Sequence, residues 1–184
     1  MSAIAPSLPS ESAAKSSRDY WKERQGHLYY DLVREWIEEF SPGRCLLDVG
    51  AWDTPVASWG RFEKRVSLDC QPRAVCGAGV EYVTADWMEY RPEFRADLVL
   101  CLQVLEHLED DRVIPFTRKL LASGQNILIS VPYRWPRGKE PSHLQDPVEA
   151  STLYRWAGKL PFRQALVTEP RGSVQRLAAL FQGV

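Results

Sequence analysis

Residues 44–55 read RCLLDVGAWDTP, a short apolar run that ends in an acid and a glycine, Asp48 and Gly50, before a sharp turn. In open α/β sheets, a buried strand that ends in this way forms one wall of a ligand crevice at its carboxyl end. A glycine is needed there because the turn uses backbone angles that a side chain disfavours. The stretch predicts a buried strand followed by a binding loop, although an ordinary strand-to-turn junction has the same pattern.

Polar residues recur at the ends of later strand-like runs. Asp69 ends the run 65–69 and follows Asp48 by 21 residues. This is close to the offset of about 20 residues at which a second strand places a carboxylate on ribose hydroxyls. Asp86 follows the run 80–85, and the apolar run 96–102 leads into Gln103. Because the carboxyl ends of parallel strands meet at one edge of a sheet, these side chains are expected to line one crevice.

Between residues 44 and 132 the sequence resembles the class I S-adenosylmethionine-dependent methyltransferases. Within them it is similar to a small-molecule group with a VLEHL segment after the fourth strand. The matching motifs, in the family's order and spacing, are LLDVG at 46–50, the acid Asp69, ADW at 85–87 and LCLQVLEHL at 100–108. The resemblance implies a Rossmann-like three-layer α/β/α sandwich. Its sheet would be seven-stranded and mostly parallel, of order 3-2-1-4-5-7-6, with a C-terminal antiparallel hairpin.

The resemblance also implies that S-adenosylmethionine binds along these strand ends. The cofactor-binding residues would be Asp48, Gly50, Ala51, Trp52, Asp69, Asp86, Trp87 and Gln103. Asp69 would accept both ribose hydroxyls, and Asp86 would accept the adenine amine. A carboxylate at a strand end can instead cap a following helix, and for Asp86 this alternative stays open.

The loop after the first strand departs from the family pattern. The family has D-x-G-x-G-x-G here, whereas Trp52 and Thr54 occupy the second and third glycine positions. In a dinucleotide site the second glycine lets the backbone approach a pyrophosphate, so Trp52 beside Asp53 is expected to obstruct an anionic ligand. S-adenosylmethionine carries a net positive charge and no phosphate. We therefore expect the loop to accept S-adenosylmethionine and to reject NAD and NADP.

Two histidines are candidate general bases, since imidazole titrates near neutral pH. His107 directly follows the fourth strand, with Glu106 expected to orient it. His143 lies in the long loop 132–148, and loops in this position often carry substrate contacts. An alternative is that Glu106 and His107 only cap and support a helix.

A metal-dependent alternative is less favoured. Methyltransferases of this group that act on the terminal ribose of small RNAs hold a divalent metal with a Glu-x-x-Glu-His run and a later histidine. Here Gln103 stands at the first glutamate position, which removes one charged oxygen ligand. We therefore predict no metal site. The charge balance, 23 Lys and Arg against 24 Asp and Glu, favours no nucleic-acid partner.

Apolar periodicity predicts the flanking elements. Residues 18–40 predict an amphipathic helix that Gly26 can interrupt, with its aromatics Tyr20, Trp21, Tyr29 and Tyr30 packed in the core. Covering the cofactor is their alternative role. The other expected elements are a short helix at 55–60, helices at 113–122 and 149–158, and strands at 126–131, 162–169 and 174–181 with a turn at 170–173. The connections 55–60 and 70–79 are too short for full helices, which predicts a trimmed version of the fold.

Length and composition indicate the number of domains and the cellular compartment. The 184 residues suit a single domain at 18–184 after a disordered tail at 1–17, rich in Ser, Ala and Pro. The four cysteines form no CxxC pair, which indicates reduced thiols in a cytoplasmic protein. No apolar run approaches the roughly 20 residues that cross a bilayer.

The sequence therefore predicts an S-adenosylmethionine-dependent methyltransferase that acts on a small-molecule or glycan-type acceptor. The alternative from another class is a methyltransferase-like protein that has lost activity and serves as a binding or partner module. The missing glycines and the short connections are compatible with that alternative.

Overall fold

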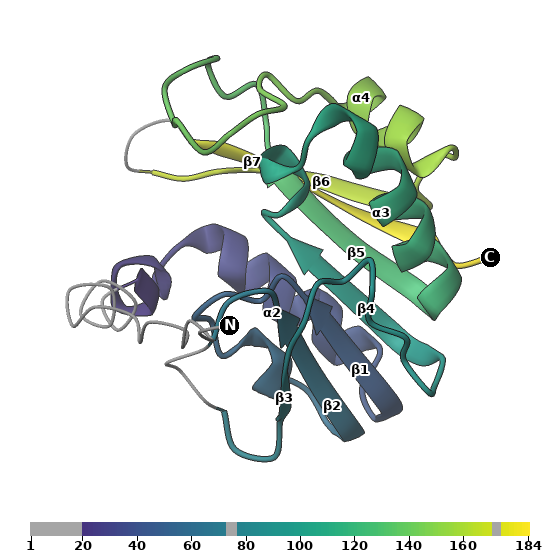
Figure 1. The fold of residues 1–184 in the computed structure, drawn as a ribbon. Helices are drawn as coiled ribbons and strands as arrows, with labels where there is room; N and C mark the ends of the chain where they lie inside the picture. Colours follow the sequence, from purple (N-terminus) through teal and green to yellow (C-terminus); the bar gives the residue numbers. More distant parts are fainter. Residues whose placement is uncertain (1–19, 73–76, 171–173) are drawn as a thin grey trace, which may run out of the picture.

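The computed structural model describes residues 20–72, 77–170 and 174–184. In this part of the chain seven strands form one sheet of order β3-β2-β1-β4-β5-β7-β6 (Figure 1). Neighbouring strands are parallel except around β7, which runs antiparallel to both β5 and β6. The strands are β1 (Gly43–Val49), β2 (Phe62–Asp69), β3 (Glu81–Thr84), β4 (Ala96–Leu102), β5 (Gly124–Pro132), β6 (Arg163–Thr168) and β7 (Gln175–Gln182). The predicted sheet order and C-terminal hairpin are confirmed.

Helices cover both faces of this sheet, as the three-layer prediction requires. One face packs on α2 (Leu28–Glu39), and the other packs on α3 (Asp110–Ser123) and α4 (Ala150–Ala157). Two short 3-10 helices, η1 (Val56–Ser58) and η2 (Leu105–His107), follow the ends of β1 and β4. Among the described residues no helix combines the length and the apolar content that a bilayer span needs.

The central strand β4 separates two hydrophobic cores. Leu98 and Leu100 pack in the core on the α2 side, whereas Val99 and Cys101 pack in the core on the α3 and α4 side. All four are fully buried. A parallel strand covered on both faces is apolar on both, which is why 98–102 is a continuous apolar run. Asp97, near the start of β4, instead accepts the backbone N–H groups of Arg44 and Cys45.

The connections on the β3 side of the sheet are short, as predicted. The chain passes from β1 to β2 through η1 alone, and the described residues between β2 and β4 form no helix outside β3. The interruption at Gly26 is also confirmed, because residues 20–24 are helical, the chain turns at 25–26 and α2 begins at Leu28. The predicted tail at 1–17 and most of the turn at 170–173 lie outside the described residues.

Most predicted boundaries agree within a few residues, and α3 shows why some shift. The helix begins at Asp110 rather than at the predicted Val113. Asp110 and Asp111 supply the first turn, where negative charge interacts favourably with the helix dipole. The apolar pattern used for the prediction cannot register polar residues that extend a helix in this way.

A carboxylate from the other end of the chain holds the start of α2. His27, at the N-cap position, makes no side-chain capping bond. Instead Glu169 accepts the backbone N–H groups of Leu28 at 3.0 Å and Tyr29 at 3.1 Å. Arg176 of β7 donates to the same carboxylate at 3.2 Å. Glu169 therefore stabilises the helix dipole and ties α2 to the C-terminal hairpin.

Replacing this carboxylate tests the connection. Glu169→Gln should lower the free energy of unfolding by about 1–3 kcal/mol, because it removes charge-assisted bonds and leaves Arg176 without its anion. Urea denaturation measures the change. Glu38→Gln, at an exposed position of the same helix, should shift stability by less than about 0.5 kcal/mol. Equal effects of the two substitutions would contradict the role of Glu169.

Candidate active site

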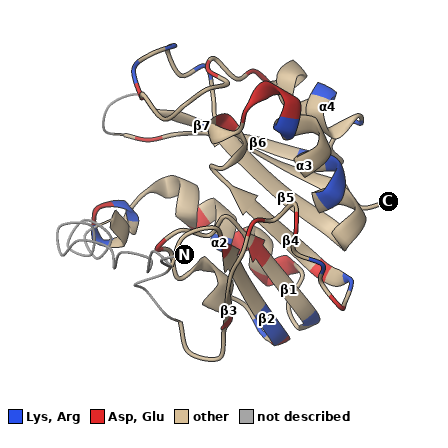
Figure 2. Cartoon of the chain, viewed as in Figure 1, with Lys and Arg blue, Asp and Glu red and all other residues tan. Residues whose placement is uncertain are grey.

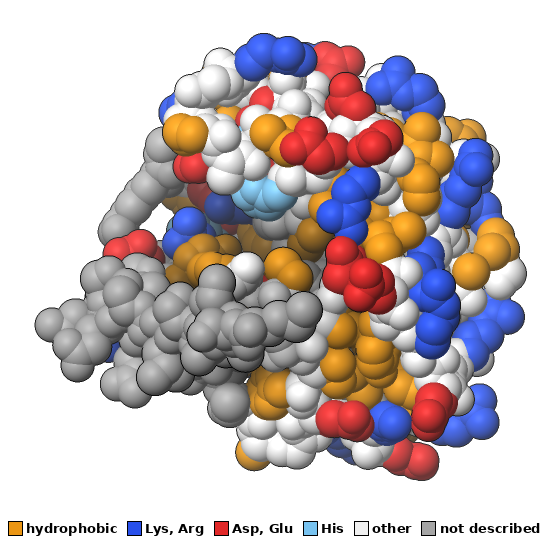
Figure 3. All heavy atoms as spheres, in the orientation of Figure 1, with side chains coloured by type: hydrophobic (Ala, Val, Ile, Leu, Met, Phe, Trp, Pro, Cys, Tyr) orange, Lys and Arg blue, Asp and Glu red, His pale blue; other side chains and the backbone are white. Residues whose placement is uncertain are grey.

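Adjoining cavities open at the carboxyl ends of the central strands. The strand-end cavity, of about 650 Å³, has a lining that includes Gly50, Asp69, Asp86, Trp87, Val104 and Arg112. The recess, of about 40 Å³, is lined by Asp48, Ala51 and Thr54 among others. The loop cavity, of about 330 Å³, has a lining that includes Glu106, Trp135, Glu140, His143 and Arg176. Tyr20 and Gln103 line all three, so the cavities form one site. The face seen in Figure 3 is hollowed, with hydrophobic side chains and a histidine at the border of the hollow.

Asp69 is the best-positioned carboxylate of the strand-end cavity. It is the last residue of β2 and is only 6% exposed. One oxygen accepts the backbone N–H of Trp52 at 2.8 Å, and the other accepts that of Gln71 at 2.9 Å. Each oxygen keeps a further acceptor position for a ligand. The predicted ribose ligand is therefore held in place by two loops before any ligand arrives.

The loop after β1 keeps a tight turn with only its first glycine. Gly50 has a φ of +73°, and a Cβ at this position would lie 2.5 Å from Val104 Cγ2. At the third glycine position of the family pattern, Thr54 is buried, and its hydroxyl donates to the Ala51 carbonyl at 3.0 Å. Side-chain hydrogen bonds of this kind replace a backbone turn. Thr54 thus closes the loop in place of a glycine.

Trp52 lines both the recess and the strand-end cavity, but its side chain does not fill them. Its backbone adopts a positive φ of 40°, as the replaced glycine would, and its side chain is 43% exposed. The indole packs edge-on against Tyr20, with the ring centroids 6.4 Å apart. Asp53, which was expected to repel an anionic ligand together with Trp52, is buried and lines none of the three cavities.

The acidic character of the site comes from strand ends instead. Asp48 lines the recess and Asp69 lines the strand-end cavity. Figure 2 shows basic residues at the opposite, amino-terminal ends of β1 and β2, where Arg44 and Lys64 lie. Acidic residues, Glu63 and Asp97, also lie at that amino-terminal end. It is therefore Asp48 and Asp69 themselves that suit the site to a ligand with positive charge.

Asp86 lines the strand-end cavity, but neighbours engage both of its oxygens. One accepts the backbone N–H of Met88 at 2.8 Å, and the other accepts Arg112 Nη2 at 2.7 Å. These two bonds, that to Met88 first, hold the pKa of Asp86 below its usual range. The carboxylate therefore caps the following turn, which is the alternative role weighed from the sequence, while it also faces the cavity. Trp87 lies behind it, 2% exposed and packed near Phe116.

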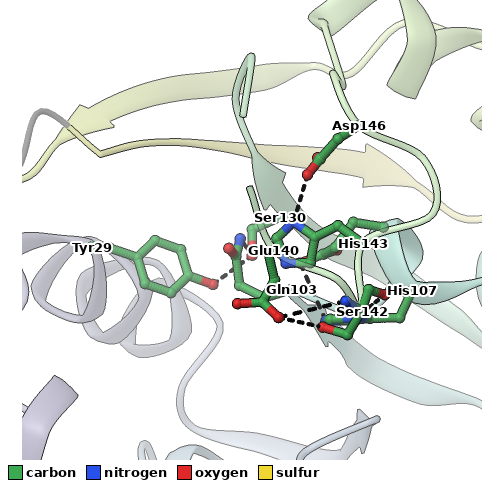
Figure 4. A network of polar contacts seen from close by, with 9 residues as sticks. Tyr29, Gln103, His107, Ser130, Glu140, Ser142, His143 and Asp146 are labelled. Atoms are coloured by element: carbon green, nitrogen blue, oxygen red, sulfur yellow. Dashed lines mark hydrogen bonds and ion pairs between the residues drawn. The ribbon is translucent and has the colours of Figure 1, made fainter. Parts of the chain in front are cut away.

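Gln103 stands where the three cavities meet. Its φ of +58° is uncommon for a residue with a side chain. Its backbone N–H donates to the Ser130 carbonyl at 3.0 Å, and its side-chain amide donates to the Ser130 hydroxyl at 3.1 Å. The Tyr29 hydroxyl bonds the same serine (Figure 4). This network fixes the Gln103 side chain between β4 and β5.

His143 is paired with a carboxylate that the sequence did not single out. Asp146 is 1% exposed, and its Oδ2 lies 2.7 Å from His143 Nδ1 (Figure 4). A carboxylate accepts, so Nδ1 carries the hydrogen and Nε2 keeps its lone pair. The His143 side chain lines the loop cavity and is 12% exposed. His143 therefore has the orientation of a base held by a second group.

His107 is held by the same loop rather than by Glu106, which corrects the expected pairing. Its Nδ1 lies 2.9 Å from the Ser142 carbonyl, so Nδ1 donates and Nε2 is free. Glu106 Oε1 is 3.9 Å from Nε2, beyond hydrogen-bond distance. Burial lowers the pKa of His107. Its ring packs edge-on to His143, with centroids 4.9 Å apart.

Glu106 is a buried carboxyl group at the wall of the loop cavity. Its side chain is 1% exposed, and Oε2 has no hydrogen-bond partner. Its backbone carbonyl accepts the N–H groups of Leu144 at 2.7 Å and Gln145 at 3.1 Å, which ties η2 to the loop. Burial raises the pKa of the carboxyl to about 8, and the charge of Asp146 adds to the shift.

Three side chains here offer atoms of types that bind metal ions. One atom each from Glu106, His107 and His143 lies within 4.8 Å of the other two. The sequence prediction of no metal rested on Gln103, which does not take part in this group. A chelator is therefore a necessary control in any assay of the site.

Solved structures with this arrangement of strands come from several enzymes. N-methyltransferase NodS from Bradyrhizobium japonicum WM9, in complex with S-adenosyl-l-homocysteine, gives a TM-score of 0.71 at 14% identity, over 94% of this chain and 97% of that one. The Burkholderia thailandensis 1,6-didemethyltoxoflavin-N1-methyltransferase gives a TM-score of 0.61 at 17% identity, over 98% of this chain and 93% of that one. The [4+2]-cyclase SpnF gives a TM-score of 0.62 at 13% identity, over 83% of this chain and 78% of that one. No protein-family model and no curated protein matches the sequence.

The chain has the class I methyltransferase fold. At these identities the likeness establishes the fold and not the reaction, and the cyclase illustrates that this fold serves more than one chemistry. The assignment of a reaction therefore depends on the residues at the strand ends.

The methyltransferase fold brings together most of the residues that the sequence singled out. The predicted cofactor residues all line the strand-end cavity or the recess, and the three predicted catalytic residues line the loop cavity. Sequence reasoning missed Asp146 and Arg176, and it placed Tyr20 in the core rather than at the cavities. A spacing of three residues between His143 and Asp146 was the available signal for the pair.

The ionisation of Glu106 has a measurable effect on stability. Below about pH 4.5 native and unfolded states both hold the proton, and above about pH 8 both have lost it. Between these values only the native state keeps the proton, so the free energy of unfolding falls as pH rises, by up to ~1.4 kcal/mol per pH unit. Glu106→Gln removes this dependence of the free energy of unfolding on pH.

The melting temperature of Glu106→Gln should therefore rise relative to that of the unmodified protein from about pH 5 to about pH 8. Above about pH 8 the difference between the two melting temperatures should stay constant. Glu109→Gln, at an exposed position, should show a difference that does not change with pH. If the Glu106→Gln difference were also independent of pH, the carboxyl would ionise normally.

Proposed function

We propose that this protein is an S-adenosylmethionine-dependent methyltransferase with a small-molecule acceptor. The observation that carries the proposal is the pair of cavities that share Tyr20, Gln103, His107 and Ser142. One cavity suits the adenosine of the donor, and the other suits the acceptor. Two of the structures with the same fold contain S-adenosylhomocysteine, the demethylated product.

The strand-end residues fit this cofactor. Asp69 presents two oriented oxygens to a ribose, and Trp87 and Val104 supply apolar walls beside Asp86 for the adenine. Gly50 leaves no room for a side chain against Val104, so the backbone at this position forms the wall of the site. The recess, with Asp48, suits the cationic methionine end. These roles agree with those implied by the sequence resemblance.

The reaction is a displacement in which the bound donor supplies an electrophilic methyl group. What remains for the protein is to align the acceptor and to remove a proton. Gln103, fixed by Ser130, separates the donor side from the acceptor side. His143 Nε2 accepts the proton of the acceptor, and Asp146 is a positioning residue that holds Nδ1. Tyr20 and Trp52 pack together at the border and limit access of water.

The acceptor is a small polar molecule, which includes glycan-type acceptors. The loop cavity, of about 330 Å³, combines aromatic surfaces with hydrogen-bonding groups, a combination that orients a small ligand. Its aromatic residues are Tyr20, Tyr30 and Trp135, and its polar residues include Arg24, Glu140 and Arg176. We also place the protein in the cytoplasm, because the described cysteines are free thiols. The proposed domain is a single one that begins at residue 18.

Calorimetric titration with S-adenosylhomocysteine tests the donor site. Asp69→Asn should weaken binding about tenfold to a hundredfold, because a charge-assisted bond to a ribose hydroxyl is worth about 1.5–3 kcal/mol. The amide oxygen keeps one loop contact, so the melting temperature should change little. Asp111→Asn, on the exposed start of α3, should bind like the unmodified protein. Equal affinity of the two variants would refute the role of Asp69.

NAD and NADP provide a specificity control in the same titration. They should give no measurable binding, because Trp52 stands where a second glycine would let the backbone approach a pyrophosphate, and Asp48 in the recess repels its charge. A preference for NAD over S-adenosylhomocysteine would show that the cofactor class is wrong.

Measurements of turnover test whether His143 is the general base. With an acceptor identified by following labelled methyl groups in a small-molecule extract, His143→Ala should cut kcat roughly a hundredfold or more. Affinity for S-adenosylhomocysteine should stay within about twofold. Added imidazole should restore part of the activity, and Asp146→Asn should lower kcat with little change in KM. Arg137→Gln, at an exposed loop position, is the matched control.

Two outcomes would change this assignment. Loss of turnover on addition of EDTA would favour the metal-dependent alternative, because Glu106, His107 and His143 lie close together. Binding of S-adenosylhomocysteine without methylation of anything in the extract would favour the inactive binding module.

A further inference from the structure

The loop cavity contains a buried carboxyl group, that of Glu106, with one oxygen that has no hydrogen-bond partner. Among the described residues, the nearest basic atom to Glu106 that lies within ion-pair distance is His107 Nε2, at 3.9 Å. Glu106 Oε2 makes no hydrogen bond. An unpaired buried carboxyl is costly for a folded protein, and such groups are retained where a ligand completes them.

The arginines of the loop cavity are engaged elsewhere. Arg176 donates to Glu169 at 3.2 Å and lies over the Tyr29 ring, with its guanidinium carbon 5.4 Å from the centroid. Arg24 stacks on Tyr20 at 3.9 Å. Neither lies within 4.0 Å of the Glu106 carboxyl in the described structure. Both arginines of the loop cavity therefore have partners of their own, and neither forms an ion pair with Glu106.

Two further carboxylates lie near Glu106, one behind the wall of the cavity and one in its lining. Asp146 faces His143 at 2.7 Å, and its second oxygen also has no partner. Glu140 lies at the open side, where Ser142 donates to it at 3.1 Å. The charged and titratable groups around Glu106 are Asp146, His107, His143 and Arg176. Because Arg176 is paired with Glu169, the Glu106 carboxyl suits a ligand with positive charge.

We propose that the methyl acceptor is a primary amine whose ammonium group binds at Glu106 in the loop cavity. This inference rests on the proposed methyltransferase function and specifies its acceptor class. A hydroxyl would donate one hydrogen bond to Glu106, whereas an ammonium also stabilises the ionised carboxylate and so favours loss of its proton on binding. The raised pKa of Glu106 agrees with a carboxyl that lacks its cation.

The chemical step balances with groups already in the cavity. The ammonium gives one proton to His143 Nε2 and becomes a neutral amine. The nitrogen lone pair forms the new N–C bond as the C–S bond breaks, and the sulfur keeps that electron pair as a thioether. The methylated nitrogen carries the positive charge and stays beside Glu106 until it leaves.

Matched probes test the amine directly. Glucosamine and glucose, and ethanolamine and ethylene glycol, differ within each pair at a nitrogen and an oxygen. Each probe is titrated into the full chain saturated with S-adenosylhomocysteine. At least one amine should bind about tenfold to a hundredfold more tightly than its hydroxyl partner, as expected for one charge-assisted contact. With labelled S-adenosylmethionine, the methyl group should appear on that amine.

Glu106→Gln should remove this preference while the affinity for S-adenosylhomocysteine stays within about twofold. Glu109→Gln, three residues further on and exposed, should keep the preference. The probe pairs on the unmodified protein decide the question even if a variant is unstable.

Different results would contradict the proposed function and the amine proposal. Loss of S-adenosylhomocysteine binding by the unmodified protein would overturn the proposed function. Normal S-adenosylhomocysteine binding with no amine preference, or a preference that survives Glu106→Gln, would overturn only the amine proposal. Stoichiometric binding of zinc that Glu106→Gln abolishes would also overturn it, because the carboxyl would then bind a metal.

Discussion

The contact between the ends of β1 and β4 is the constraint on which the site depends. A Cβ on Gly50 would lie 2.5 Å from Val104 Cγ2, so the two strand ends approach as closely as a glycine allows. The Gly50 N–H also donates to the Leu68 carbonyl at 2.8 Å, which fixes the turn against β2. This close approach brings the recess, the strand-end cavity and the loop cavity together around Gln103.

Backbone strain is concentrated at the same edge of the sheet. Positive φ angles occur at Trp52, Gln103 and Arg134, which follow β1, β4 and β5. Each such residue costs about 1–3 kcal/mol and persists only where its surroundings hold it. Asp69 holds the Trp52 N–H, Ser130 holds that of Gln103, and the Val148 carbonyl accepts that of Arg134 at 2.9 Å. Hydrogen bonds from neighbouring segments therefore maintain a strained rim around the cavities.

The predictions from sequence were most accurate where one residue's role follows from its strand. Asp69 could be identified because a buried run leads directly into it, and the backbone contacts at its two oxygens agree with a ligand-binding carboxylate. Asp53 could not be judged in this way. It stands beside Trp52 in the loop, and nothing in the pattern shows that one of these side chains is buried and the other exposed. Glu106 was assigned to His107 because the two are adjacent in sequence, whereas the structure gives that histidine the Ser142 carbonyl.

The sequence by itself determined where most strands lie along the chain and which residues stand at their carboxyl ends, because periodicity and strand-end chemistry are local properties of the chain. The order of the strands in the sheet followed from the family resemblance. Only the tertiary structure decided which charged groups have partners. Glu169 caps a helix about 140 residues away, Asp146 meets His143 through the folding of one loop, and Glu106 Oε2 is left without a hydrogen-bond partner. Pairing of charges depends on distances of a few ångströms between segments that are remote in sequence, and burial then multiplies the effect of each distance by lowering the local dielectric.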